Sequence, residues 1–201
     1  MIEELLSQSW TQWIALVTGV IYVVLAARTN NACWLFGIVS CAFIAWDDFF
    51  TFRLYADGVL QITYIGLGVL GLVTWLRNGS EEGGSFDIVE DDIARHAVVI
   101  AVAAAISWPL SLLLAKYTDA QFGFLDTLTT LLSLYATTLL VRKVMSNWLY
   151  WIIIDIVYVY IFARSGGTLV AVLYGIFTVV AIYGWFNWRS IRLKSIEMKS
   201  K

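Results

Sequence analysis

The sequence predicts an all-α integral membrane protein with seven transmembrane helices. Of its 201 residues, 60% are hydrophobic, 14% are charged and only one is a proline. The mean hydropathy of +0.78 lies well outside the range of soluble globular domains. A bilayer core about 30 Å thick needs roughly 20 apolar residues per helix, so seven spans with short connections use nearly the whole chain. We expect no separate soluble domain.

Seven apolar runs in chain order predict the spans. They cover residues 13–27, 33–50, 59–76, 97–115, 124–141, 148–163 and 169–187. The expected organisation is a single membrane domain over 1–201. Its parts are a first three-helix bundle (10–77), an acidic cytoplasmic loop (78–95), a linker helix (96–116), a second three-helix bundle (122–189) and a basic cytoplasmic tail (190–201). Residues 1–10 lack the positively charged start of a secretory signal, so we expect the first span to remain in the mature chain.

A repeat relates the first three spans to the last three. Four positions recur: Arg28, Trp34, Gly71 and Trp75 match Arg142, Trp148, Gly184 and Trp188. Because one span separates the two triplets, both enter the membrane from the same side, which predicts a parallel 3+1+3 repeat. Duplicated bundles of this kind usually bind substrate between their halves.

The positive charges predict the orientation in the membrane. Seven spans place ten of the 13 Lys and Arg residues on the side of the C-terminus and only three on the other. We therefore expect the C-terminus in the cytoplasm and the N-terminus outside. The acidic stretch 78–95 is interpreted as a flexible, solvated connection without a binding role.

The sixth span carries the most prominent polar and aromatic face. It begins at Asn147, and Trp148, Trp151, Asp155 and Tyr158 follow at helical spacing, so the last four share one face. Asp155 lies about 12 Å from Trp148 along the helix axis, near the middle of the hydrocarbon. A carboxylate at that depth costs several kcal/mol unless it meets a cation, a donor or water.

The third and seventh spans add four more candidate substrate-binding residues: Gln61, Tyr64, Tyr174 and Phe177. Gln61 offers a donor and an acceptor, as an amide ligand would need. Aromatic faces beside one carboxylate and one amide suit a flat aromatic ligand with a positive charge. Plainer alternatives remain open, since Gln61 could join two helices and Asp155 could be protonated or bonded to Tyr158 or Ser133.

Other polar and aromatic residues are interpreted as interfacial. Trp148 could belong to the membrane-interface belt, which is where we expect Trp10, Trp13, Trp34, Trp75 and Trp188. Asp47 and Asp48 are expected to be solvated at the outer end of the second span, although they could attract cations to an entrance. Cys33 and Cys41 lie about 12 Å apart on one helix, too far for a disulfide.

Enzyme signatures are missing from the sequence. The single histidine, His96, has no metal-binding partner motif, and neither GxSxG nor a Walker A sequence occurs. None of the lysines lies inside a predicted span, which excludes a retinal Schiff base. We expect no enzymatic activity, no cofactor, no metal and no nucleic-acid partner.

Three segments together resemble the Pnu family of bacterial vitamin transporters over residues 13–188. They are Asn147-Trp148-x-x-Trp151 with Asp155, Leu54-Tyr55-x-Asp57-x-x-Leu60-Gln61-x-x-Tyr64, and Trp13-Ile14-x-x-x-Thr18-Gly19-x-x-Tyr22. The resemblance implies a SWEET-like fold, in which a linker helix joins two three-helix bundles. It also implies a homotrimer in the inner membrane. Family binding roles transfer most directly to Trp148, Trp151 and Gln61.

The same resemblance implies facilitated diffusion of a vitamin precursor by alternating access, made one-way by a cytosolic kinase. Nicotinamide riboside (the PnuC branch) is the expected substrate, and thiamine (PnuT) is the rival; riboflavin (PnuX) is disfavoured because Asp155 suits a cation. The third span ends Gly71-Leu72-Val73-Thr74-Trp75 where PnuC proteins commonly have Tyr-Gly-Trp, so the branch stays open. More distant alternatives are an ion channel and a membrane receptor that does not transport.

Overall fold

The computed structural model describes residues 9–53, 55–79, 87–117 and 123–199. Within them the elements are α2 (Trp10–Ala27), α3 (Cys33–Trp46), η1 (Asp47–Phe52), α4 (Tyr55–Gly79), α5 (Ile93–Tyr117), α6 (Gly123–Val141), α7 (Asn147–Arg164) and α8 (Thr168–Lys199). Seven helices are long and apolar enough to cross a bilayer, with η1 continuing α3. The predicted set of seven spans is confirmed. Leu54 and residues 80–86 of the acidic loop lie outside the described residues, as do 1–8, 118–122 and 200–201.

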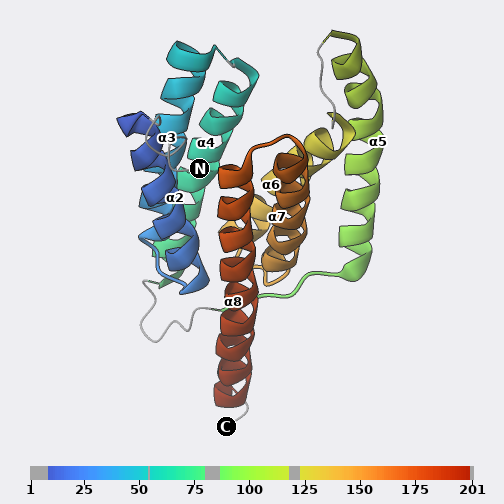
Figure 1. The fold of residues 1–201 in the computed structure, drawn as a ribbon. Coiled ribbons are helices and arrows are strands. Elements are labelled where there is room, and N and C mark those ends of the chain that lie inside the picture. The colour runs from blue at the N-terminus through green and yellow to red at the C-terminus, as the bar shows by residue number, and fades with distance from the viewer. Residues whose placement is uncertain (1–8, 54, 80–86, 118–122, 200–201) are drawn as a thin grey trace.

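The helices form two groups with one helix set apart (Figure 1). Within each group the helices pack in sequence, α2 on α3 on α4 and α6 on α7 on α8, while α5 packs on α6. The two groups meet where α2 contacts α8 and where α4 contacts α6. The name tail end is used for the end of the molecule at which α2, α4 and α6 finish and from which α8 projects. The opposite end is the head end. The division into bundles given above remains a prediction.

Four tryptophans pack together at the tail end. Trp34 and Trp75 meet edge to face at 5.4 Å between ring centroids, and Trp148 and Trp188 do so at 5.6 Å. The Trp75 and Trp188 rings lie 6.1 Å apart, which joins the two pairs. We call these four residues the tryptophan cluster.

Glycine makes room for each pair. A Cβ atom on Gly71 would lie 2.5 Å from the Trp34 ring, and one on Gly184 would lie 2.7 Å from the Trp148 ring. The same glycine-to-tryptophan contact therefore occurs at both sets of matched positions. This supports the predicted repeat.

Hydrogen bonds cross between the halves in both directions. The Trp75 indole donates to the Val141 carbonyl at 3.1 Å, and the Trp188 indole donates to the Ala26 carbonyl at 3.2 Å. The Asn187 amide adds a bond to the Ala27 carbonyl at 2.9 Å. Carbonyls in the last turn of a helix have no intrahelical partner. Each half thus satisfies helix-end carbonyls of the other.

The interfacial assignment of Trp34, Trp75 and Trp188 is wrong. Their exposed fractions are 2%, 0% and 0%. Tryptophan is common at the membrane interface because water there can accept a hydrogen bond from its indole N–H. In this protein, carbonyls of the opposite half accept the hydrogen bonds of Trp75 and Trp188 instead. Trp10 and Trp13 are exposed on the outer surface, and their place at the membrane interface stays a prediction.

The described end of the acidic connection is docked against the tail end, although most of its carboxylates stay exposed to solvent. The Val89 N–H donates to the Lys143 carbonyl at 3.0 Å, and the Met145 N–H donates to the Val89 carbonyl at 2.9 Å. Asp87 pairs with Lys199 at 2.9 Å, and Glu90 pairs with Arg192. Opposite charges on α8 therefore hold this segment against the tail end.

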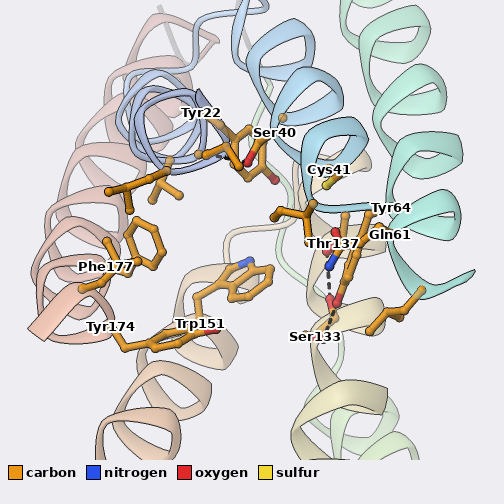
Figure 2. A pocket seen from close by; sticks show the side chains of 18 of the residues that line it. Tyr22, Ser40, Cys41, Gln61, Tyr64, Ser133, Thr137, Trp151, Tyr174 and Phe177 are labelled. Carbon is orange, nitrogen blue, oxygen red and sulfur yellow. Dashed lines mark hydrogen bonds between the residues drawn. The ribbon is translucent and has the colours of Figure 1, made fainter. Parts of the chain in front are cut away.

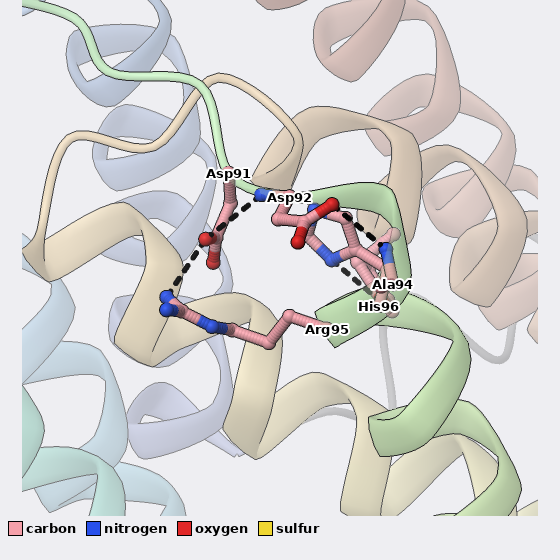
Figure 3. A network of polar contacts seen from close by, with 6 residues as sticks. Asp91, Asp92, Ala94, Arg95 and His96 are labelled. Atoms are coloured by element: carbon pink, nitrogen blue, oxygen red, sulfur yellow. Dashed lines mark hydrogen bonds and ion pairs between the residues drawn. The ribbon is translucent and has the colours of Figure 1, made fainter.

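The start of α5 is fixed by polar contacts next to that segment (Figure 3). Asp92 precedes the helix, and its carboxylate accepts from the Ala94 N–H at 3.1 Å, as an N-cap does. Asp91 pairs with Arg95 at 2.7 Å. Partial burial raises the pKa of Asp91, but the Asp92 N–H and the Arg95 guanidinium outweigh this effect and hold the pKa below its usual value. His96 Nδ1 lies 3.2 Å from the Tyr150 hydroxyl on α7.

We expect Gly184→Ala to lower the free energy of unfolding by about 1–3 kcal/mol, because the added methyl group overpacks a buried tryptophan ring. Thermal unfolding of the detergent-solubilised protein measures the change. Gly175→Ala, also on α8, is the matched control, since nothing lies within 4 Å of the position that its Cβ would take. Equal stability of the two variants would contradict the tight packing of Trp148 on Gly184.

Candidate functional site

A cavity of about 600 Å³ lies between the two groups of helices. Residues of α2, α3, η1 and α4 line one side, and residues of α6, α7 and α8 line the other. Figure 2 shows Trp151, Tyr174 and Phe177 across open space from Gln61, Tyr64 and Ser133, with Tyr22 and Ser40 along another wall. The volume of the cavity falls within the range typical of small-molecule sites.

The α7 face supplies an aromatic ring and a carboxylate. Trp151, Asp155 and Tyr158 all line the cavity, as their helical spacing predicts. Asp155 is only 3% exposed. Its carboxylate has no hydrogen-bond or ion-pair partner among the described residues, so neither Tyr158 nor Ser133 neutralises it. A desolvated carboxylate without a partner is either protonated or paired with a cation, so this position suits a cationic ligand beside the Trp151 ring.

Trp148 and Asn147 lie differently from Trp151. Trp148 lines the tail end of the cavity, but it is 2% exposed because its ring is packed against Gly184 and Trp188. The Asn147 side chain is buried and donates to the Val144 carbonyl at 2.7 Å. Asn147 is not among the described residues that line the cavity. Trp148 therefore forms part of the cavity floor, and Asn147 stabilises the turn before α7.

The α4 wall contributes an amide and a phenol. The Tyr64 hydroxyl lies 2.5 Å from Ser133 Oγ on α6, and Ser133 Oγ donates to the Thr130 carbonyl at 2.8 Å. Because the single Ser133 proton is used in that bond, Tyr64 is the donor to Ser133. Gln61 lines the cavity one turn away and has no side-chain partner in the described part of the chain. Its amide is free to meet a ligand rather than another helix.

The α8 wall is aromatic. Tyr174 stacks on Tyr158 with ring centroids 4.7 Å apart and an interplanar angle of 30°. Phe177 meets Tyr174 edge to face at 6.0 Å. Both predicted residues line the cavity, so a flat ring beside Trp151 would be surrounded by aromatic faces.

The first two helices supply lining residues that the sequence analysis did not select. Among them are Tyr22, Ser40 and Cys41. Ser40 Oγ donates to the Ala15 carbonyl on α2 at 2.8 Å, which joins α2 to α3 beside the cavity. Tyr22 belongs to one of the motifs that carry the family resemblance. That motif was the signal in the sequence that could have identified Tyr22 as a lining residue.

Asp47 and Asp48 also line the cavity, and the expectation that they are solvated is wrong. Their exposed fractions are 5% and 6%. They begin the π-helical turn η1, and a π-helical turn widens the helix and often marks a functional site. Thr11 Oγ1 on α2 donates to both Asp47 oxygens, at 2.8 and 2.9 Å.

No lysine or arginine is among the described residues that line the cavity. The formal charge of the lining is therefore negative, from Asp47, Asp48 and Asp155. Such a site favours a cation and disfavours a phosphate group, which proteins bind with Arg, Lys or a helix N-terminus.

Seven helices of membrane length around an aromatic and acidic cavity are typical of a membrane transporter for a small solute. Comparison with known proteins supports the assignment to this class. Residues 9–190 match the model of the family described as nicotinamide mononucleotide transporter. The chain belongs to this family and is a multi-pass membrane transporter, not an enzyme.

Several relatives are curated as nicotinamide riboside transporter PnuC. The protein from Escherichia coli (strain K12) is 24% identical over 204 residues, covering 90% of this chain and 85% of its own length. The protein from Neisseria mucosa is 22% identical, covering 91% of this chain and 73% of its own length. A solved structure titled "Crystal structure of the Vitamin B3 transporter PnuC" has a TM-score of 0.70 and 20% identity over 93% of this chain and 83% of its own. This likeness confirms the predicted all-helical membrane fold.

We expect a membrane-permeant maleimide to label Cys41 and not Cys33, because Cys41 lines the cavity whereas Cys33 is fully buried. The variants Cys33→Ala and Cys41→Ala each retain one thiol, so mass spectrometry of the labelled protein compares the two sites. Labelling of both thiols only after denaturation would contradict an accessible cavity next to α3.

Proposed function

We propose that this protein carries nicotinamide riboside across the bacterial inner membrane by facilitated diffusion. The carboxylate of Asp155 supports this most directly, because it has no partner in the described part of the chain and lines the cavity beside Trp151. Nicotinamide riboside has a flat pyridinium ring with a positive charge, an amide and ribose hydroxyls. The relatives named above are nicotinamide riboside transporters.

The proposed binding mode uses three elements of the cavity. The pyridinium ring stacks on Trp151, Asp155 offsets its charge, and Gln61 hydrogen-bonds its amide or ribose. Tyr64, Tyr158, Tyr174 and Phe177 complete the walls. Trp148 supports the floor from below the ring, and Asn147 takes no part in binding.

An unphosphorylated substrate agrees better with the cavity than a nucleotide does. The phosphate of nicotinamide mononucleotide would enter an acidic cavity whose described lining has no basic side chain. Placing a phosphate dianion near Asp155 is repulsive in a low-dielectric site. The riboside should therefore bind far more tightly than the nucleotide.

Alternating access and one-way uptake complete the proposal. The tryptophan cluster closes the cavity at the tail end, and this end would open after the substrate has entered from the head end. The tail end carries most of the basic residues, so we place it and the C-terminus in the cytoplasm and the N-terminus outside. A cytosolic kinase would then phosphorylate the product and retain it. We infer a homotrimer in lipid from the family resemblance.

Thiamine is the second candidate, because it is also an aromatic cation and would suit the same aromatic walls and carboxylate. Calorimetric titration of the purified protein with nicotinamide riboside, thiamine and nicotinamide mononucleotide separates the cases. We expect the riboside to bind and the nucleotide to bind at least tenfold more weakly. Binding of thiamine alone would assign the protein to the thiamine branch. Absence of binding with all three ligands would contradict the proposal.

We expect Trp151→Ala to weaken riboside binding by about 1–3 kcal/mol, the range for loss of one stacked ring. The same titration measures it. Trp13→Ala is the matched control, because Trp13 is exposed on the outer surface and does not line the cavity. Unchanged affinity of the Trp151 variant would show that Trp151 does not contact the bound riboside.

Asp155→Asn should weaken binding of the cationic riboside by about 2–5 kcal/mol, in line with the removal of one partner of a buried charge pair. The neutral dihydropyridine form of the riboside, which lacks the ring charge, should lose little affinity. Titration of the variant with both forms of the riboside measures this difference. An equal loss of affinity for the two forms would mean that Asp155 maintains the structure of the site and does not pair with the ring charge.

A further inference from the structure

A second group of carboxylates lies at the head end, outside the site around Asp155. Asp47 and Asp48 begin η1, Asp57 lies in the first turn of α4, and Asp126 lies in the first turn of α6. Asp57 is close enough to interact electrostatically with both Asp48 and Asp126. No ion pair joins any of these four carboxylates to a basic side chain in the described ranges.

The two buried members of the group differ in their partners. Asp47 is satisfied, because Thr11 donates to it and the Thr51 hydroxyl lies 3.4 Å away. Asp48 is 94% buried and lines the cavity, yet its Oδ2 has no hydrogen-bond partner. A desolvated carboxylate oxygen without a donor costs several kcal/mol. One oxygen of the Asp48 carboxylate is therefore unpaired at the cavity wall, where a cation in the cavity would offset its charge.

Local packing holds these acids close together. Gly58 follows Asp57, and a Cβ atom there would lie 2.7 Å from the Phe49 ring of η1. This contact fixes the first turn of α4 against the π-helical turn, so that Asp57 stays near Asp48. The arrangement thus depends on structure around it and is not a chance meeting of surface charges.

The surroundings of Asp48 favour an organic cation over a metal ion. Alkaline-earth ions need about six to eight oxygen ligands, whereas Asp47 already accepts two hydrogen bonds and the neighbouring lining includes Phe52 and Leu60. A carboxylate next to apolar and aromatic side chains matches a positively charged heteroaromatic ring. Gln61 lies one helical turn, about 6 Å, beyond Asp57 along α4. The head-end group therefore adjoins the central site.

We propose that Asp48, together with Asp47 and Asp57, forms a capture site for organic heteroaromatic cations at the head end of the cavity. The substrate pauses there before it moves past Gln61 to Trp151 and Asp155. This inference rests on the proposed function in its choice of ligand, but it assigns a separate role to residues outside the central site. Its effect is on the rate of entry of cations at low concentration, because opposite charge at a cleft raises the local concentration of the ligand.

The test compares two substrates of nearly equal size that differ in charge. Proteoliposomes with wild-type protein or Asp48→Asn take up nicotinamide riboside or its neutral dihydropyridine form at concentrations far below saturation. We expect the variant to lose about tenfold in uptake of the cation and to keep its uptake of the neutral form. Uptake of the cation at saturation should change much less than uptake at low concentration.

Two further variants keep this test decisive. Asp92→Asn is the matched control, since Asp92 is an exposed carboxylate at the tail end and asparagine can still cap α5. Asp57→Asn replaces an exposed member of the group and decides the question if Asp48→Asn does not fold. Equal losses for both substrates, or no loss in either head-end variant, would overturn the capture site.

Failure of the proposed function would look different. A wild-type protein that carries neither form contradicts nicotinamide riboside transport itself. The capture site is then judged by calorimetry with N-methylnicotinamide, a small pyridinium cation. Asp48→Asn must weaken its binding about tenfold relative to Asp92→Asn, and equal binding to the two variants would overturn the inference.

Discussion

Two indole N–H groups, each donated across the molecule to the end of a helix in the opposite half, hold the tail end together. Trp75 reaches Val141, and Trp188 reaches Ala26. In a bilayer the last carbonyls of a helix cannot all rely on water, so such bonds are worth more than their number suggests. They fix the distance between the halves at one end. The cavity is the space left where the halves do not touch.

Some polar groups that line the cavity build the fold, and others are left for a ligand. Ser40, Tyr64 and Ser133 all form hydrogen bonds that position the walls. Asp155 and Gln61 have no such partners in the described part of the chain, although both line the cavity. Ionisable groups inside a membrane protein are costly and are commonly retained for function. Asp155 and Gln61 are therefore available to meet a ligand in the cavity.

Hydrophobic runs and helical spacing were enough to predict the seven spans and the shared face of Trp151 and Asp155. They could not show that Trp34 is buried, because its position depends on Gly71 in another helix. Asp48 was misjudged for a similar reason. A π-helical turn changes which residues face inward, and no periodic pattern in the sequence announces it. Contacts between helices far apart in the chain were the part that the sequence did not reveal.

The reciprocal tryptophan bonds also bear on how such a chain could arise. A half-length protein with one tryptophan donor and one helix-end carbonyl would leave both groups unsatisfied as a monomer. Two identical copies, turned about a two-fold axis, would satisfy both at once and enclose a symmetric chamber. Fusion of two such copies with the same membrane orientation requires an extra crossing between them, which is the place that α5 occupies. Duplication then frees each half to diverge, so that one can specialise in an acidic entrance and the other in an aromatic wall.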